Sequence, residues 1–152
     1  MPDTVFPPKT MKRSLNAGIE RLPTGGGAGT SVSSGSGAGT FGSYTQFSAD
    51  LGEDAEIVGI MVSDEPNAST SLYYVSAEIA TGPGASETVR TSLINNLDGS
   101  TATAPIPLTM LPVPIKVPNG TRVAVRLADS HASAYPHNVV LFWVRDANLE
   151  GY

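Results

Sequence analysis

The sequence predicts an all-β protein, an antiparallel β-sandwich of jelly-roll type. From residue 41 onward, about seven or eight short segments rich in β-branched and aromatic residues follow one another. Gly, Pro and Asn turn signals separate these segments, as in sandwich domains. No helical segment of crossover length lies between them, which argues against a parallel α/β sheet. The 152 residues suit one domain.

Residues 1–40 are predicted to form an extended N-terminal arm, with the sandwich spanning residues 41–152. Apolar residues at helical spacing over 10–22 favour one short amphipathic helix, and an irregular arm is an equal alternative. Residues 25–40, GGGAGTSVSSGSGAGT, have the composition of a flexible linker, with Val32 as the one large apolar side chain.

Three strands are predicted in the first half of the body. Residues 41–48 form the first, and residues 55–63 form the second, with Gly59 as a bulge. Residues 72–81 alternate, so that one face of this strand carries Tyr73, Val75, Ala77 and Ile79.

The second half of the body continues the strand pattern. Residues 87–95 form a strand, and the prolines of 106–118 favour an edge or an inter-sheet crossing, because proline cannot donate to a ladder. Asn119-Gly120 then predicts a hairpin. Residues 121–128 point Val123, Val125 and Leu127 inward and Arg122 and Arg126 outward. Residues 138–145 are apolar on both faces, which is typical of a central strand.

The charge is unevenly placed along the chain. Residues 1–40 carry four basic and two acidic residues, whereas the remainder carries five basic and twelve acidic residues. An arm of net +2 on a body of net −7 indicates that the arm binds an acidic partner. The body lacks the basic face that nucleic acid requires. The predicted partner-binding residues are Lys9, Lys12, Arg13 and Arg21.

The motifs for chemistry are weak. There is no cysteine, which excludes disulfides and thiolate sites. Residues 37–42 match GxGxxG, but these glycines follow a linker and precede a strand, the wrong context for a dinucleotide site. No apolar run has the length of a signal peptide or a membrane span. We therefore expect no catalytic residue, no cofactor and no membrane partner.

Three groups of residues have two interpretations each, one functional and one structural. A metal site can be drawn from Asp129, His131 and His137, although an exposed, unliganded polar loop is favoured. The acidic cluster Asp50, Glu53, Asp54 and Glu56 offers calcium-type ligands, although a solvated turn is favoured. A sugar-binding face is conceivable from Tyr44, Tyr73, Tyr74, Tyr135 and Trp143, although Trp143 is expected in the core.

Two stretches resemble a known group of proteins. They are EIATGPGASE at 78–87 and PVPIKVPNGTRVAVRLADS at 112–130. Together they resemble small β-sandwich virion proteins of tailed bacteriophages, of the head-decoration, head-fibre or minor virion type, over roughly residues 44–145. The resemblance implies a jelly-roll-like fold, homo-oligomers (commonly trimers), attachment to the capsid lattice, and no catalytic residues.

The resulting expectation is a non-enzymatic capsid decoration or cement protein. It would bind the major capsid protein on the outer surface of the head through its arm and stabilise the shell, after synthesis in the bacterial cytoplasm. One alternative is another virion position, such as a tail, a collar or the base of a head fibre. A second is a carbohydrate-binding sandwich, which predicts exposed coplanar aromatics and binding without the arm. An enzyme would need a buried polar cluster in a cleft.

Overall fold

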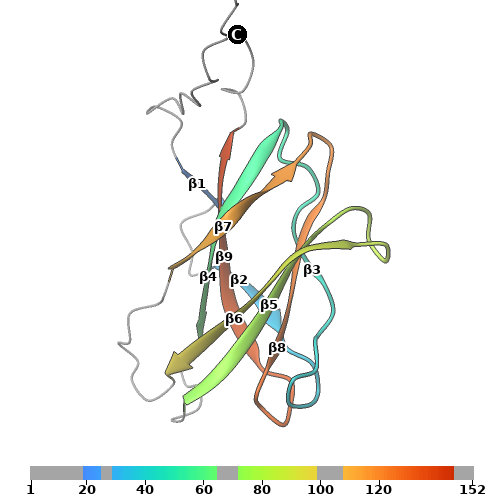
Figure 1. The fold of residues 1–152 in the computed structure, drawn as a ribbon. Helices are drawn as coiled ribbons and strands as arrows, with labels where there is room; N and C mark the ends of the chain where they lie inside the picture. The colour runs from blue at the N-terminus through green and yellow to red at the C-terminus, as the bar shows by residue number, and fades with distance from the viewer. Residues whose placement is uncertain (1–18, 25–28, 65–71, 99–107, 146–152) are drawn as a thin grey trace, which may run out of the picture.

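The computed structural model describes residues 19–24, 29–64, 72–98 and 108–145, and these contain no helix. Figure 1 shows two layers of strands. Sheet A has the order β1-β9-β4-β7, with β2 also on β9, and sheet B has the order β3-β8-β5-β6. All pairs are antiparallel, so the predicted all-β sandwich is confirmed. The strands are β1 (Glu20–Leu22), β2 (Thr30–Ser33), β3 (Thr45–Ser48), β4 (Ala55–Asp64), β5 (Leu72–Thr81), β6 (Thr88–Asp98), β7 (Leu108–Val117), β8 (Val123–Asp129) and β9 (Pro136–Arg145).

The order of pairing is that of a jelly roll. The innermost strands along the chain, β5 and β6, pair with each other, and β4 pairs with β7. The next pair outward is β3 with β8, and the outermost is β1 and β2 with β9. A long antiparallel hairpin rolled into two sheets produces this nesting. Among the described strands, only β5 and β6 are both consecutive in the chain and paired.

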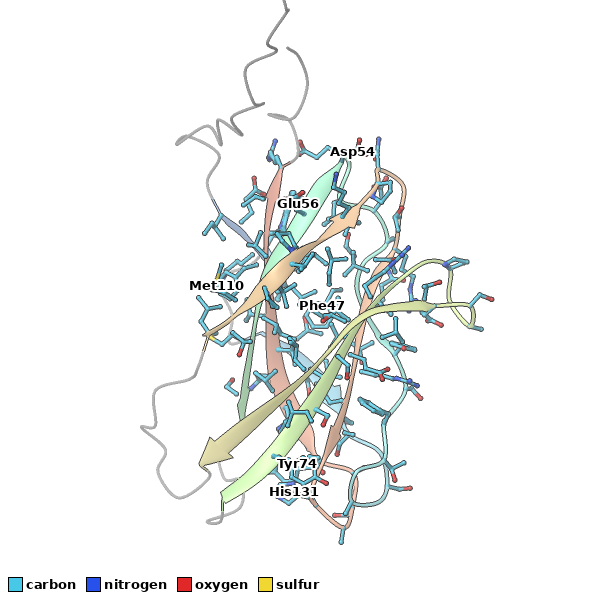
Figure 2. The ribbon with its side chains drawn as sticks, viewed as in Figure 1. Phe47, Asp54, Glu56, Tyr74, Met110 and His131 are labelled. Carbon is cyan, nitrogen blue, oxygen red and sulfur yellow. The ribbon has the colours of Figure 1, made fainter. Side chains whose placement is uncertain are left out.

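The core lies between the sheets and follows the period of two expected for strands. On β5, Val75, Ala77 and Ile79, which were predicted to share one face, are fully buried. Trp143 is buried in β9, which has a partner strand on each side, also as predicted. Figure 2 shows Phe47 between the two layers, packed against this core. The other predicted inward residues that are fully buried are Val123, Val125 and Leu127.

The start of the sandwich differs from the predicted arm. Strands β1 and β2 lie end to end along β9, with Leu22 opposite Leu141 and Val32 opposite His137. Leu22 and Val32 are both buried in the core cluster. The sandwich therefore includes residues from Glu20 onward, and the end of the predicted 10–22 helix is a strand. The rest of that helix lies outside the described residues.

Glycines in this stretch allow close backbone packing. A Cβ at Gly42 would lie 2.2 Å from the carbonyl oxygen of Ser33, and one at Gly35 would lie 2.5 Å from that of Thr40. Gly29 has a φ of 130°, and its Cβ would lie 2.8 Å from the carbonyl oxygen of Val139. A flexible linker was predicted over 25–40, but its described part, residues 29–40, is a strand and a turn packed tightly against neighbouring backbone.

One strand and one turn also differ from their predictions. Strand β3 begins at Thr45 instead of residue 41. The Asn119-Gly120 turn does not form a hairpin, because it connects β7 of sheet A with β8 of sheet B. The predicted bulge at Gly59 is confirmed by the shift in register between Ile57 and Gly59, and β7 is an edge strand as expected.

Candidate functional site

The middle of the outer face of sheet A is apolar. On β9, the core side chains are Val139, Leu141 and Trp143, so alternation turns Val140 and Phe142 outward. Met61 of β4 turns outward for the same reason, between the core residues Ile60 and Val62. Figure 2 shows Met110 of β7 pointing away from the interior of the sandwich. We call this surface the sheet A face, and it comprises Met61, Leu108, Met110, Val140 and Phe142.

Strand register places these side chains in two neighbouring rows. Met61 pairs with Val140 on one side and with Leu108 on the other. Gly59 pairs with Phe142 on one side and with Met110 on the other. A Cβ at Gly59 would lie 3.4 Å from both the Met110 sulfur and a methyl of Leu108. Large apolar side chains therefore lie side by side across three strands.

The edge of the sheet A face at β7 is open to solvent. Leu108 is 49% exposed and Met110 is 54% exposed. Met61 and Phe142 are half-buried, and Val140 is buried. Leu108 and Met110 are therefore the accessible part of the sheet A face.

The outer face of sheet B carries paired charges over β8 and β5, and the exposed Ile94 on its edge strand β6. Arg126 of β8 donates to Glu78 of β5 at 2.7 Å. Its guanidinium lies over the rings of Phe41 and Tyr44, at 4.8 and 4.6 Å from their centroids. A planar guanidinium suits this stacking. Tyr44 also hydrogen-bonds to Glu78 at 3.3 Å, and burial, with Glu78, raises the pKa of Tyr44 despite the opposing effect of Arg126. Arg126 and Glu78 on this face therefore pair with each other and with neighbouring aromatic side chains.

The predicted partner-binding cations fall in two places. Lys9, Lys12 and Arg13 lie outside the described residues. Arg21 lies in β1, directly opposite Phe142 in the register. The structure therefore places one of the four cations at the β1 border of the sheet A face.

A second cluster surrounds the carboxylate of Asp129, and its member His131 lies at the opposite end of the sandwich from Asp54 (Figure 2). Asp129 and His137 are completely buried, which differs from the exposed loop expected here. Asp129 Oδ2 lies 2.9 Å from His137 Nε2 and 3.2 Å from His131 Nδ1. Asp129 Oδ1 accepts the His131 backbone N–H at 2.9 Å. The Ser34 hydroxyl bonds to Asp129 and accepts the Tyr135 N–H at 2.9 Å.

The contacts of this cluster hold strands together, and they are not arranged as a metal site. Both imidazoles are directed at one carboxylate oxygen, so they do not converge on a shared open point as metal ligands do. The described residues contain no group of three or more His, Cys, Asp or Glu that is arranged to hold a metal ion. Burial raises the pKa of Asp129, but hydrogen bonds from His137, Ser34 and His131 outweigh it, so the pKa is lowered. The ionised carboxylate joins β2, β8 and β9.

The acidic cluster at the other end stabilises a turn. Asp50 Oδ1 accepts the N–H groups of Gly52 and Gly120, each at 2.8 Å, and these bonds lower the pKa of Asp50. Asp54 Oδ1 accepts the Asn119 N–H at 2.7 Å. Glu53 lies 3.1 Å from Arg145 Nη1. Asp50 and Asp54 therefore fasten the β3–β4 loop to the 118–120 turn, and Glu53 connects the same loop to the end of β9.

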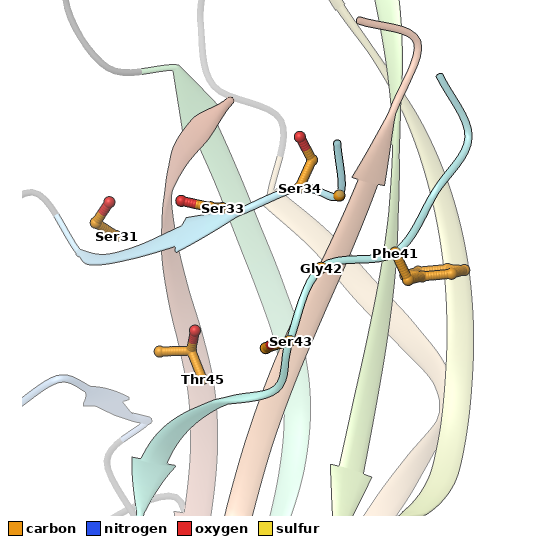
Figure 3. Close-up of a pocket in the computed structure, with 8 residues that line it drawn as sticks. Ser31, Ser33, Ser34, Phe41, Gly42, Ser43 and Thr45 are labelled. Atoms are coloured by element: carbon orange, nitrogen blue, oxygen red, sulfur yellow. The ribbon is translucent and has the colours of Figure 1, made fainter. Parts of the chain in front are cut away.

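A groove lined with hydroxyl groups runs between β2 and the segment before β3 (Figure 3). Its volume is about 510 Å³. The buried Ser34 at its end is already bonded to Asp129 and Tyr135, so no buried polar group is directed into it. Its lining is Ser31, Ser33, Ser34, Gly35, Phe41, Gly42, Ser43 and Thr45.

The remaining sequence candidates are dispersed. The 37–42 glycines lie in the connection from β2 to β3, with no helix following them. Tyr135 stacks on His131, with ring centroids 4.8 Å apart, whereas Tyr44 lies on sheet B. Trp143 is in the core, and the side chain of Tyr73 lies outside the description. Tyr74 is 41% exposed on β5. Among the described side chains, Tyr44, Tyr135 and Trp143 therefore do not form one platform.

Comparisons with known proteins give no relative: no family model, no curated protein and no solved structure matches the chain. No helix among the described residues is long and apolar enough to cross a membrane. Sequence reasoning missed the sheet A face. Its signal was the two-sided apolarity of residues 138–145, which was attributed only to a central position in the sheet.

Proposed function

We propose that this chain is a non-enzymatic structural protein of a tailed-bacteriophage virion, specifically a decoration protein on the outer surface of the head. It binds the major capsid protein through the basic residues near its N-terminus and stabilises the shell. It works as a homo-oligomer, and the sequence resemblance favours a trimer. A tail, collar or head-fibre position is the alternative within the same class.

The observation that supports this proposal best is the contrast between the two outer faces. Sheet B pairs its charges internally, through Arg126 with Glu78 and Arg122 with Glu87. Sheet A exposes Leu108 and Met110 at its β7 edge, without charged partners beside them in the same two rows, which suits a module that assembles with other proteins. Both polar clusters, around Asp129 and Asp50, serve to hold loops together. The jelly-roll fold is compatible with capsid proteins and with lectins alike, so the sequence resemblance supplies the choice between them.

The test is binding to purified heads of the phage that encodes the chain, stripped of this protein. The full chain is compared with a variant carrying Lys9→Gln, Lys12→Gln and Arg13→Gln. A deletion of residues 1–40 is unsuitable, because it would remove Leu22 and Val32 from the core. The matched control is Arg90→Gln, a cation of sheet B outside the N-terminal region.

The expected result is saturable pelleting of the full chain with heads, at least tenfold weaker for the triple variant and unchanged for the control. Binding should weaken with salt, because surface charge pairs are screened. No pelleting of the full chain would reject the decoration role, and the same assay on tails would then examine the alternative position. Retention on a glycan array without head binding would favour a carbohydrate-binding module.

A further inference from the structure

We infer that the outer edge of β6 accepts an extended segment of another protein as an added strand. Strand β6 is the last strand of sheet B, and among the described strands it pairs only with β5 (Figure 1). The backbone N–H and C=O groups on its other edge therefore have no strand to bind within the described part of the chain. Such a row of backbone groups is a template for a strand from another chain.

The other edges of the two sheets are poorly suited to strand addition. Strand β7 contains Pro112 and Pro114, which lack a backbone N–H, and its residues 111–114 are skipped in the register with β4. Strands β1, β2 and β3 have only three or four residues each. Prolines, bulges and short strands are the means by which natural proteins protect the edges of sheets.

Strand β6 lacks this protection over most of its length. It has 11 residues, and its pairing with β5 is continuous from Thr91 to Asp98. The one shift in register comes before this stretch, at Arg90, whose side chain donates to Thr81 at 2.7 Å. The sequence of the continuous stretch, TSLINNLD, contains no proline and no charged residue before Asp98. At about 3.3 Å per residue it is long enough for a complete added strand.

The side chains along this edge define the segment that fits. Leu93 turns inward, where it is half-buried against the core. Ile94 turns to the outer face, opposite Ser76, and is 72% exposed. Because successive side chains of a strand alternate, an added strand places one side chain beside Leu93 and the next beside Ile94. The segment therefore has two adjacent apolar, β-branched residues, flanked by uncharged polar residues that suit Thr91 and Ser92.

Charge favours a segment of another protein over a second copy. Two copies joined edge to edge at β6 would bring together two chains that each carry a net charge of −5. An uncharged or basic segment meets no such repulsion. The inference goes beyond the proposed role, because it assigns a second interface, on sheet B, separate from the basic residues near the N-terminus.

The test is titration of the full chain into a synthetic peptide of this chemistry. The probe is a blocked, fluorescein-labelled octapeptide with adjacent isoleucine and valine at its centre, threonine on both sides and lysine at each end. Binding is followed by fluorescence anisotropy up to about 1 mM protein, and hydrogen exchange of the β6 amides is measured by NMR with and without the peptide. The control peptide has its central backbone nitrogens methylated, which removes their hydrogen-bond donors and keeps the side chains.

The expected result is saturable binding of the probe, at least tenfold weaker for the methylated peptide. Alternate amides between Thr91 and Asp98 should exchange at least tenfold more slowly in the complex. Ile94→Lys should weaken binding at least tenfold, because lysine on an edge strand opposes strand addition. The matched control is Val113→Lys, which should leave binding unchanged, because Val113 is 75% exposed but lies on the β7 edge. Urea midpoints verify that every variant remains folded.

Each outcome decides the question. Binding that protects β6 and is lost in Ile94→Lys alone supports the inference. No saturable binding overturns it, as do equal binding of the methylated peptide and protection confined to another strand. A mass that rises above the 15.7 kDa of one chain and returns to it in Ile94→Lys would assign the edge to a second copy, and would also overturn the inference. The proposed role fails separately, because head binding is measured through Lys9, Lys12 and Arg13, whereas the peptide reports on β6.

Discussion

Replacement of Val32 by alanine examines the difference between a linker and a strand most directly. Val32 is the one large apolar residue of the Gly/Ser-rich stretch, and it is fully buried in β2. Removing two carbons loses about 1.6 kcal/mol of transfer free energy, at about 0.8 kcal/mol each. An unrelaxed cavity of about 50 Å³ would add roughly 1 kcal/mol. Val32→Ala is therefore expected to lower the free energy of unfolding by about 2–3 kcal/mol.

The assay is urea unfolding at pH 7 followed by tryptophan fluorescence, because the single tryptophan, Trp143, lies in the core on β9. The midpoint should fall with little change in slope, and the melting temperature should fall by about 5–10 °C. Ser33→Ala is the control, since Ser33 is exposed on the same strand and surface changes cost less than about 0.5 kcal/mol. A loss below about 0.5 kcal/mol for Val32→Ala would refute the packing of Val32 in the core and would support the interpretation of this stretch as a flexible linker.

Two further predictions concern the same end of the fold. Gly42→Ala should destabilise the protein by about 2 kcal/mol or more, because its Cβ would lie 2.2 Å from the Ser33 oxygen; Gly84→Ala, with nothing within 4 Å, should stay within about 1 kcal/mol of the wild type in the same urea assay. Asp129→Asn should cost about 2–3 kcal/mol at pH 7. Because the pKa of Asp129 is lowered on folding, its contribution is complete above about pH 4 and disappears as the pH falls through the folded pKa; a difference from the wild type that stays constant from pH 7 to pH 3 would contradict this.

The fold class could be predicted because strand periodicity is local. Alternation grouped Val75 with Ile79 on one face of β5, and it correctly turned Val123 and Leu127 inward on β8. Proline in β7 correctly indicated an edge strand. The hairpin predicted at Asn119-Gly120 was wrong, because a turn sequence specifies a reversal of the chain but not whether the next strand joins the same sheet.

The sites depended on distant contacts, which a single sequence does not carry. Composition cannot distinguish a flexible glycine from Gly42, whose role depends on the approach of Ser33. The sequence indicated Asp129 and His137 as members of a polar loop. Their burial could not be predicted, because it depends on the packing of Ser34 beside them, and Ser34 hydrogen-bonds to Tyr135, 101 residues later. The sheet A face required the register of three strands, because Leu108, Met61 and Val140 are far apart in the chain.

The nested pairing of strands also determines when the domain can finish folding during synthesis. Glu20 of β1 forms an ion pair with Arg145, 125 residues later. Until β9 leaves the ribosome, β1 and β2 have no strand to pair with, and Leu22 and Val32 have no complete core to enter. The hairpin of β5 and β6 can form much earlier, since it closes a short loop. Long-range pairing of this kind slows folding. The Ser- and Gly-rich composition of residues 29–40 then has a second benefit. Before β9 has been synthesised this segment is unpaired, and because it has few apolar side chains it exposes little surface that could aggregate.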